Sequence, residues 1–402
     1  MRAASTPTQR PADARLLVVD AEGGVLHAAR SDLALQLSRG DLLIANDAAT
    51  IPASLGGVHV RSGRPIEVRL AGRRTLAPDD VCELTAVVFG SGDHRTRTED
   101  RPPPPALRAG DRLALGPLEA EVEALLDHPR LVTLRFAAGP EAIWAGLAAH
   151  GRPIQYAHLQ RPLALWDVWT RVAAVPAAFE PPSAGFVLDW RLLETLAQRG
   201  IGFATLTHAA GISSTGDREL DARLPFDEPY VLPATTVQAM ERTRAAGGRV
   251  VAVGTTVARA LEDAARRDTG LRAGPGLATL RLGEDTVLRV VDALLTGTHE
   301  PGESHYELLR AFAGDGILAR MSAALEEGDY RTHEFGDSVL IERRQGASET
   351  RQARSPDAVP ASPPAVAASR WLREAPSGAP PPAGRSEGAQ NLTRDETPNV
   401  RG

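Results

Sequence analysis

The stretch Arg249–Asp263, RVVAVGTTVARALED, predicts a strand, a tight turn and a helix in one short run. Val250–Val253 is continuously apolar and rich in β-branched residues, which is typical of a strand covered on both faces. Gly254 permits a sharp turn, and Thr255 or Thr256 is expected to cap the helix that follows. The free N–H groups at the start of that helix would lie at the carboxyl end of the strand, a place that suits an anion or a carboxylate.

Arg259 and Glu262 are three positions apart, so they share one face of the predicted helix. Taken alone, the pair fits an ion pair on the surface of an ordinary strand–helix unit. It also fits a functional site built on that unit, and the choice between the two depends on the rest of the chain.

A second informative stretch is Asp41–Leu55, DLLIANDAATIPASL. Leu42–Ile44 predicts another buried strand, which Asn46 and Asp47 end with side chains that can bind nearby backbone or a ligand. A polar pair at the end of a buried strand is a common place for a site in α/β folds. It is also a common place for a plain turn, and this stretch alone does not distinguish them.

Composition limits the classes of protein that this chain can represent. Its 402 residues predict two domains, or one domain with an insertion. A formal charge of −6 argues against a protein that coats nucleic acid non-specifically, although a local face of arginines could still bind RNA. The single cysteine, Cys82, excludes a disulfide framework and a metal site made of cysteines. We expect a cytoplasmic protein, because no apolar run is long enough for a membrane helix and residues 1–15 lack a signal-peptide core.

The patterns predict a mixed α/β fold in which a small β-barrel interrupts the larger domain. Between residues 56 and 147 the apolar runs are short and alternating and are separated by Gly, Pro and Asp turns, which favours an inserted barrel or sandwich. Residues 15–55 and 148–343 would then form one discontinuous α/β domain. The Ala, Pro, Ser, Arg and Gly composition of residues 345–402 predicts a disordered tail.

Four further segments of the α/β domain have clear patterns. We expect helices over Phe186–Gly200, Pro233–Ala246 (capped by Thr235 or Thr236) and Tyr306–Ala313, and a strand over Thr286–Thr296.

Histidines occur at three suggestive places in the same domain. His208 ends a predicted buried strand, Ile201–His208, and precedes a loop of small residues. His150 and His158, with Tyr156 between them, lie in an irregular stretch that fits either a surface loop or the lining of a cleft. The usual nucleotide-binding, serine-hydrolase and zinc-protease motifs do not occur in the sequence.

Taken together, these stretches resemble the S-adenosylmethionine:tRNA ribosyltransferase-isomerase family of queuosine biosynthesis, in the same order from about Arg15 to Ile341. Residues 40–55 resemble the motif GDLLVxNxTRVIPARL, and residues 249–262 resemble RVIAVGTTSVRxLE. Residues 291–314 resemble VDALxTNFHLPxSTLxMLVSAFAG, and residues 330–341 resemble YRFxSYGDAMLI. Shorter blocks correspond to GHxPLPPY, PTAGLHF and LHVGxGTF. The chain departs from these motifs where two Arg are replaced by Ala49 and Ser54, and where a His is replaced by Val187.

The resemblance implies an enzyme that consumes S-adenosylmethionine as a ribosyl donor and modifies 7-aminomethyl-7-deazaguanine in tRNA to epoxyqueuosine. It implies no metal, and a monomer or weak homo-oligomer is expected. Carried over by motif position, the proton-transfer residues would be His208, Glu228 and His299, and the donor would be bound by Thr255, Thr256 and Arg259. Asn46, His150 and Tyr156 would bind the acceptor substrate. The departures leave two alternatives open: a paralogue that binds a nucleoside-type ligand without this activity, and an enzyme with a small-molecule acceptor.

Overall fold

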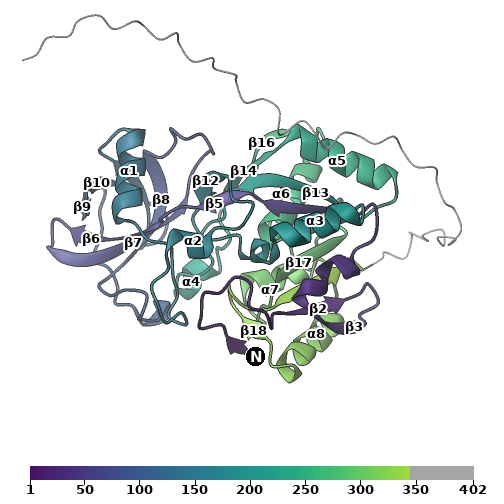
Figure 1. Ribbon diagram of the computed structural model, residues 1–402. Helices are drawn as coiled ribbons and strands as arrows, with labels where there is room; N and C mark the ends of the chain where they lie inside the picture. The colour runs from purple at the N-terminus through teal and green to yellow at the C-terminus, as the bar shows by residue number, and fades with distance from the viewer. Residues whose placement is uncertain (345–402) are drawn as a thin grey trace, which may run out of the picture. The chain divides into compact units, whose positions relative to one another are not determined.

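The computed structural model describes residues 1–344, whose largest element is a nine-stranded sheet (Figure 1). In spatial order its strands are β16 (Gly274–Ala278), β14 (Glu228–Leu232), β13 (Gly202–His208), β4 (Leu42–Asn46), β15 (Val250–Val253), β17 (Ala293–Gly297), β19 (Ser338–Glu342), β2 (Arg15–Val19) and β3 (Val25–Ala29). The four central strands, β13, β4, β15 and β17, are parallel to their neighbours within that group. Their carboxyl ends therefore lie along one edge of the sheet.

The stretch that begins the sequence argument folds as predicted, except at its turn. β15 is buried along its whole length, and α6 (Thr255–Arg266) follows it directly. Gly254 occupies the N-cap position with φ +101°, a backbone conformation that favours glycine, so neither Thr255 nor Thr256 caps the helix. The hydroxyls of Thr255 and Thr256 therefore make no N-cap hydrogen bond at this edge of the sheet.

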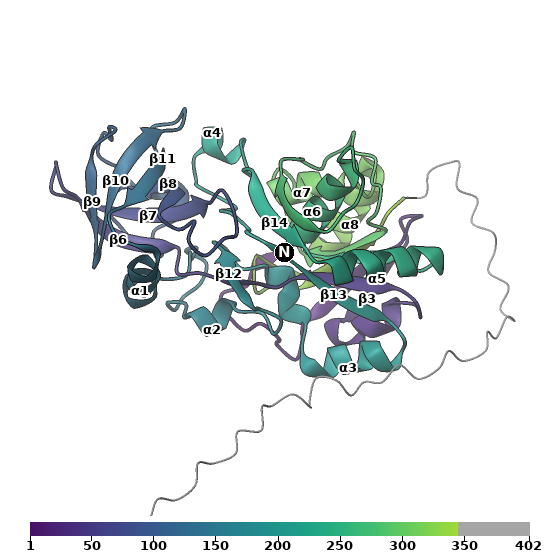
Figure 2. The same ribbon diagram turned by 90° about the horizontal axis from the view of Figure 1, so that it is seen from above.

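Different helices cover the two faces of the sheet. Because side chains alternate along a strand, Leu42 and Ile44 of β4 pack with α5 (Ala234–Ala245), α6 and α8 (Asp315–Glu327). Leu43 and Ala45 pack instead with α3 (Trp190–Gln198). Figure 2 shows α3 on the side of β13 that is opposite to α5 and α6. β4 is thus buried on both faces, as its apolar sequence predicted.

Four predicted element boundaries were wrong. The helix expected over Tyr306–Ala313 is α7 (Ser304–Leu309), which begins two residues earlier and ends four residues earlier than predicted. The helix expected over Phe186–Gly200 begins only at Trp190, because Asp189 is its N-cap and accepts a hydrogen bond from the Leu192 N–H at 2.7 Å. Pro233, and not a threonine, is the N-cap of α5. The strand expected over Thr286–Thr296 exists only as β17.

The first part of that predicted strand is held by a carboxylate from a helix. Glu262 is fully buried, and its oxygens accept hydrogen bonds from the backbone N–H groups of residues 289–291 at 2.8–3.0 Å. Arg266 completes the site with an ion pair of 2.6 Å. Backbone donors that a neighbouring strand would have used are therefore bound to Glu262. The predicted surface pair of Arg259 with Glu262 does not form.

Six antiparallel strands close into the predicted barrel. Around the barrel they are β10 (Leu118–Leu125), β11 (Leu131–Phe136), β8 (Glu83–Phe89), β7 (Arg64–Gly72), β6 (Ser54–His59) and β9 (Arg112–Leu115). α1 (Pro140–His150) packs on it, because Gly146 lets the helix approach Leu118 closely. The fold class, an α/β protein with a small inserted barrel, is confirmed. The exact domain boundaries at 55/56 and 147/148 stay a prediction.

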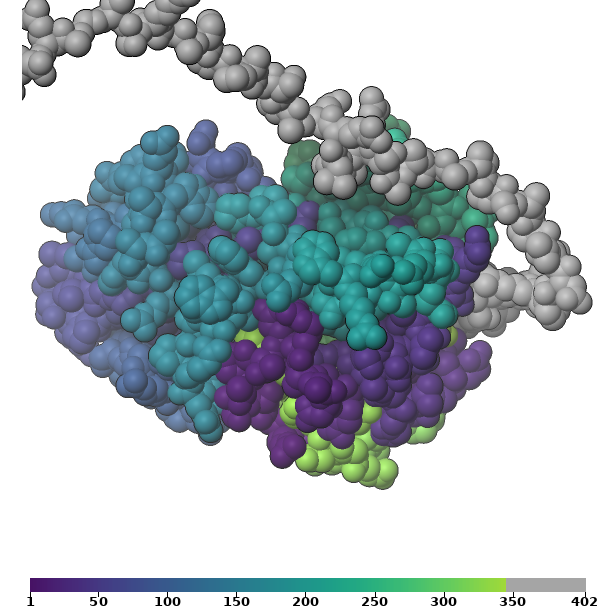
Figure 3. All heavy atoms as spheres, viewed as in Figure 1, coloured from purple at the N-terminus to yellow at the C-terminus, as the bar shows by residue number. Residues whose placement is uncertain are grey.

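Shorter elements complete the residues that the structure describes. They are β1 (Arg2–Ala3), β5 (Ala48–Thr50), β12 (Val175–Ala178), β18 (Arg331–Thr332), α2 (Leu165–Val168), α4 (Arg218–Asp221), α7 (Ser304–Leu309) and the 3-10 helices Arg30–Gln36, Thr98–Asp100 and Ser183–Val187. β1 pairs with β18, so the purple N-terminal residues lie against yellow-green ones in Figure 3. None of the helices in residues 1–344 is long and apolar enough to span a membrane. The disordered tail predicted for 345–402 lies outside the described residues.

One ionic cluster ties the amino ends of β4 and β15 to the carboxyl end of the antiparallel strand β19. Asp41, just before β4, is 1% exposed and accepts hydrogen bonds from the backbone N–H and the guanidinium of Arg249 at 2.6–3.0 Å. It also accepts the N–H of Ser38 at 2.8 Å. Arg249 pairs in addition with Glu342 of β19. The cluster therefore joins β4, β15 and β19 at the edge opposite the candidate site.

We expect Asp41→Ala to lower the free energy of unfolding by about 3–5 kcal/mol, because it leaves Arg249 and two N–H groups without their acceptor in a buried place. Urea unfolding of the full chain measures this. Glu194→Ala, in the exposed part of α3, is the control and should change stability by less than about 0.5 kcal/mol. Equal stability of the two variants would contradict the structural role given to Asp41.

Candidate functional site

The register of the sheet brings the predicted site residues from distant parts of the sequence to one edge. Asn46 pairs with Leu206 in the β4–β13 ladder, and Ala45 pairs with Val253 in the β4–β15 ladder. Asn46, His208 and the start of α6 therefore lie next to one another. β17 ends at the same edge, which adds the segment from Thr296 to His299.

Asn46 holds the backbone of His208 in place. Its side-chain N–H donates to the His208 carbonyl at 2.9 Å, and its side-chain oxygen accepts the His208 N–H at 3.0 Å. The same oxygen accepts the N–H of Ala48 at 3.0 Å. Asn46 is 2% exposed, so its amide orients the end of β13 from within the protein. The substrate contact expected for Asn46 stays a prediction.

His208 is fully buried, and its imidazole is held neutral. Its Nε2 lies 3.4 Å from Glu228 Oε2, in a geometry that makes no hydrogen bond, and neither ring nitrogen has a hydrogen-bond partner in the described chain. Burial, together with the positive charge of Arg259, lowers the pKa of His208 to about 3. At neutral pH the ring is therefore uncharged and has no proton in excess to donate as an acid.

Glu228 and Arg259 form a buried ion pair beside this imidazole. Arg259 Nη1 lies 2.5 Å from Glu228 Oε2, and the other carboxylate oxygen accepts the N–H of Gly211 at 2.5 Å. The remaining Arg259 nitrogens donate to the carbonyls of Phe226, Ala278 and Leu280 at 2.6–2.8 Å. Burial raises the pKa of Glu228, and Arg259 opposes that rise. The guanidinium of Arg259 is thus bound to Glu228 and to three backbone carbonyls. It lies in α6, one helical turn after Thr255 and Thr256.

The half-buried Thr255 and Thr256 follow Gly254, which lies close to Ala184 in the segment of residues 182–185. A side chain at Gly254 would come within 3.5 Å of Ala184. α6 begins at Thr255 without a side-chain cap, so its first N–H groups point toward this edge of the sheet. Such a helix start suits a carboxylate.

His299 lies at the far end of the same edge. Its Nε2 is 2.8 Å from the Thr296 hydroxyl, and its ring is 5.0 Å from the ring of His305. Burial, with His305 and His333 nearby, lowers the pKa of His299 well below its usual value. Its side chain is 15% exposed. Unlike His208, His299 therefore combines a neutral ring with a surface that a ligand can touch.

A group of titratable residues that the motif positions did not single out lies beside His299. His333 stacks on His158 with ring centroids 4.2 Å apart, and His158 Nε2 lies 3.0 Å from Glu334 Oε2. Burial alone would raise the pKa of Glu334, but the hydrogen bond and charge of His158 outweigh it and lower the pKa. His333 has φ +67°, a backbone conformation uncommon for a residue with a side chain.

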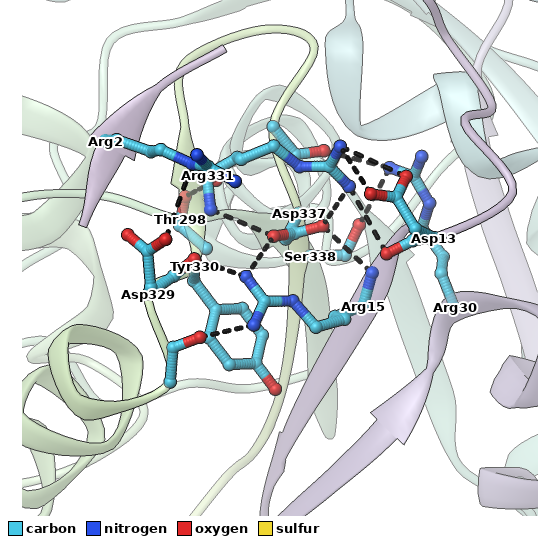
Figure 4. A network of polar contacts seen from close by, with 12 residues as sticks. Arg2, Asp13, Arg15, Arg30, Thr298, Asp329, Tyr330, Arg331, Asp337 and Ser338 are labelled. Atoms are coloured by element: carbon cyan, nitrogen blue, oxygen red, sulfur yellow. Dashed lines mark hydrogen bonds and ion pairs between the residues drawn. The ribbon is translucent and has the colours of Figure 1, made fainter.

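Asp337 holds both ends of the loop that carries His333 and Glu334, and Figure 4 shows it between Arg15 and Arg331. Its carboxylate accepts hydrogen bonds from the backbone and guanidinium of Arg15 at 2.9–3.1 Å, and from those of Arg331 at 2.9–3.0 Å. Thr298, next to His299, donates to the Arg331 carbonyl at 2.6 Å. Asp337 thus connects β2, β18 and β19 to the segment that ends at His299.

Tyr156 and His158 belong to this neighbourhood, but His150 makes its contacts elsewhere. The Tyr156 hydroxyl donates to Glu180 at 2.5 Å and accepts the N–H of Ser214 at 3.2 Å, in the loop after His208. His150 Nε2 lies 2.7 Å from the carbonyl of Gly56 at the barrel. The structure thus does not bring His150 together with the other candidates, and its substrate role stays a prediction.

Glu180, His305, His333 and Glu334 could not be found from spacing. Each lies in a loop or at a helix start, where the sequence has no periodicity that orients a side chain. In the described part of the chain, no group of three or more His, Cys, Asp or Glu residues is arranged so that it could hold a metal ion.

We expect His208 to make the protein less stable in acid. Its folded pKa of about 3 lies below the ordinary value of 6.5, so only the unfolded chain takes up a proton at this residue between these values. The contribution of the neutral His208 to the free energy of unfolding is fully present above the unfolded pKa of 6.5, and it decreases as pH falls from there toward about 3. Urea unfolding should show that His208→Gln removes about 2 kcal/mol of the wild-type loss between pH 7 and about pH 5. An equal loss in both proteins would contradict the buried, neutral ring.

Comparison with known proteins agrees with the motifs. A family model described as "Queuosine biosynthesis protein" matches residues 1–341. An S-adenosylmethionine:tRNA ribosyltransferase-isomerase of Synechococcus elongatus is 34% identical over 342 residues, which are 82% of this chain and 89% of that protein. One of Sorangium cellulosum is 36% identical over 362 residues, 84% and 94% of the two chains.

A match among solved structures is the S-adenosylmethionine tRNA ribosyltransferase of Thermotoga maritima. The two chains are 24% identical, the match covers 84% of this chain and 96% of that one, and the TM-score is 0.45. The family assignment rests on the sequence matches: the family model spans residues 1–341, and both relatives are aligned over most of their own length. This chain belongs to the family of S-adenosylmethionine:tRNA ribosyltransferase-isomerases of queuosine biosynthesis.

Proposed function

We propose that this chain transfers the ribosyl group of S-adenosylmethionine to 7-aminomethyl-7-deazaguanine in tRNA and isomerises it to epoxyqueuosine, releasing adenine and methionine. The observation that carries the proposal is the convergence of motif residues from four separate strand ends. His208, the Gly254 turn and His299 lie far apart in sequence, yet they share one edge of the sheet with Asn46. Open α/β sheets bind their ligands at this edge.

The reaction needs a base and an acid. The sulfonium makes the neighbouring C5′ protons acidic, so a neutral group within reach can remove one. His299 suits this role best, because its ring is neutral and its side chain is partly exposed. His208 is 0% exposed and cannot touch a ligand unless its covering atoms move.

Glu228 and His208 act together behind this surface in our proposal. Burial raises the pKa of Glu228 and lowers that of His208. Compared with the same two groups in water, a proton shared by this pair is therefore shifted from the imidazole toward the carboxylate. Adenine leaves more easily when it is protonated, and Glu228 is the candidate that could supply the proton. Arg259 holds Glu228 in place and limits how readily it takes a proton up.

The donor's carboxylate is assigned to the start of α6. Thr255 and Thr256 supply hydroxyls there, and the first helical N–H groups add a favourable dipole. Arg259 already satisfies Glu228 and three carbonyls. We therefore give Arg259 an indirect role in donor binding, unlike the direct one that the motif position implied.

The acceptor side differs from the family motifs. Ala49 and Ser54 stand at the two motif arginines, and the Ser54 hydroxyl donates to Glu67 at 2.8 Å. Contacts with tRNA would have to come from other arginines, since Arg is the only basic residue type besides His in the sequence. The two alternatives, a non-catalytic paralogue and a small-molecule acceptor, have no specific observation in their favour. A cytoplasmic location and a monomer or weak homo-oligomer remain proposals.

Single-turnover release of adenine from S-adenosylmethionine tests the proposed function. We expect release that depends on tRNA carrying 7-aminomethyl-7-deazaguanine, and a loss of about a hundredfold or more in His299→Gln, because general base catalysis typically contributes that much. tRNA with unmodified guanine at the same position is the control. Tight donor binding without release under either condition would point to the non-catalytic paralogue. Release without any tRNA would contradict the RNA acceptor.

We expect the double substitution Thr255→Ala and Thr256→Ala to weaken binding of S-adenosylmethionine by about tenfold to a hundredfold. Hydrogen bonds to a charged group contribute about 1.5–3 kcal/mol. Calorimetric titration measures the affinity, and Thr195→Ala in α3, whose hydroxyl bonds the Arg191 carbonyl, is the matched control. S-Adenosylhomocysteine, which keeps the carboxylate but lacks the sulfonium, should lose affinity equally. Unchanged affinity in the double variant would remove this assignment.

A further inference from the structure

Glu180 is a buried carboxyl group that takes part in none of the ion pairs within the described chain. It lies just after β12, in a Pro-rich turn, and is 7% exposed. The Tyr156 hydroxyl donates to its Oε1 at 2.5 Å, and Ser213 provides further hydrogen bonds from its side chain and its backbone. Burying a carboxyl group without a cation costs free energy, which hydrogen bonds from the protein partly offset.

These hydrogen bonds hold the loop of residues 209–215, which directly follows His208. The backbone N–H groups of Phe179 and Glu180 donate to the Ala210 carbonyl at 2.8 and 3.3 Å. The Tyr156 hydroxyl accepts the Ser214 N–H at 3.2 Å and also lies 3.1 Å from the Ser214 carbonyl oxygen. The loop is thus held at its beginning by the backbone of Phe179 and Glu180, and at its end by the Tyr156 hydroxyl and by Asp221, which accepts hydrogen bonds from Thr215.

The middle of the loop holds the Glu228 carboxylate. The N–H of Gly211 donates to Glu228 Oε1 at 2.5 Å. A side chain at Gly211 would come within 2.8 Å of that oxygen and 2.9 Å of the Ala71 carbonyl, so the loop has no room to shift toward Glu228. A displacement of the loop would therefore also change the distance from Glu228 to His208, which is 3.4 Å.

We propose that Glu180 and Tyr156 are positioning residues of the site: they anchor the loop of residues 209–215 and, through the Gly211 N–H, set the place of the Glu228 carboxylate. The catalytic consequence rests on the proposed function, whereas the anchoring itself does not. Neither residue has to touch the substrate for this role.

The anchor should respond to pH near neutrality. Burial raises the pKa of Glu180 to about 7, against the opposing hydrogen bonds of Ser213 and Tyr156, and Glu334 adds to the rise. The other charged group that faces it is Arg69 of β7, while His158 faces Glu334. Below this pKa the neutral acid is well tolerated by its buried surroundings. A loop that opens lets the carboxyl ionise at its ordinary value of 4.5, so closing of the loop becomes less favourable as pH rises from about 4.5 to about 7.

Two variants distinguish the anchoring of the loop from the protonation of Glu180. Glu180→Gln imitates the neutral acid, so the loop should stay anchored at every pH. Tyr156→Phe removes the hydroxyl that binds both Glu180 and Ser214, so the anchor should be weak at every pH. Glu194→Gln in the exposed part of α3, and Tyr306→Phe, whose hydroxyl lies 3.4 Å from Ser322, are the matched controls.

Hydrogen–deuterium exchange of the peptide that contains residues 209–215 is the first measurement, corrected for the intrinsic pH dependence of exchange. In the wild type, we expect exchange to increase as pH rises from about 4.5 to about 7 and to level off above this range, and the increase should be absent in Glu180→Gln. Tyr156→Phe should exchange faster than the wild type on both sides of neutral pH. The two controls should match the wild type.

The kinetic measurement is the pH profile of adenine release with the modified tRNA. We expect Tyr156→Phe to lower kcat by about tenfold to a hundredfold while KM for S-adenosylmethionine changes less than about threefold, because the loss is one of positioning. Glu180→Gln should keep the wild-type rate on the acidic side and lose the decrease that the wild type shows as pH rises toward neutral.

The outcomes separate this inference from the proposed function. Wild-type exchange behaviour in both Glu180→Gln and Tyr156→Phe would overturn the inference, whatever the kinetics show. If the wild type releases no adenine, the proposed function fails, and the exchange measurement still decides whether the pair anchors the loop. Altered exchange with unaltered kcat would overturn the link to Glu228.

Discussion

The parallel hydrogen bonding of β4 with β13 on one side and β15 on the other is the constraint on which the rest of this structure depends. Parallel pairing aligns the carboxyl ends of the strands, and burial of β4 on both faces specifies its register, since a slip by one residue would exchange its two packed surfaces. Asp41 and Arg249 tie the amino ends of the same strands. Polar residues just beyond the strand ends therefore meet at a single edge.

The polar groups at this edge mostly bind one another. Asn46 orients His208, and Arg259 holds Glu228. Removing such groups from water is unfavourable unless their hydrogen bonds are made within the protein, and a neutral imidazole avoids the larger cost of burying a charge. The candidate site thus has two layers. Buried Asn46 and Arg259 orient His208 and Glu228, and the partly exposed outer layer contains His299 and the start of α6.

Loops determine how these layers meet. Asp337 binds Arg15 and Arg331 and so holds the turn that carries His333 and Glu334. Glu180 and Tyr156 hold the loop after His208 in a similar manner. In both cases a buried carboxyl group gathers donors from segments that are distant in sequence. Arg69 of the barrel lies over the Tyr156 ring, with 5.6 Å between the guanidinium carbon and the ring centroid, so the barrel also borders this region.

The sequence by itself determined the alternation of buried strands and helices, the barrel and the family, because these depend on local periodicity, turn residues and ordered motifs. It placed His208 and His299 at strand ends for the same reason. Only the tertiary structure decided that Arg259 pairs with Glu228 and that Glu262 binds the backbone of residues 289–291. Helical spacing puts Arg259 and Glu262 on one face of α6. Both side chains are buried, so each charge needs a partner, and these partners come from segments that only folding brings together.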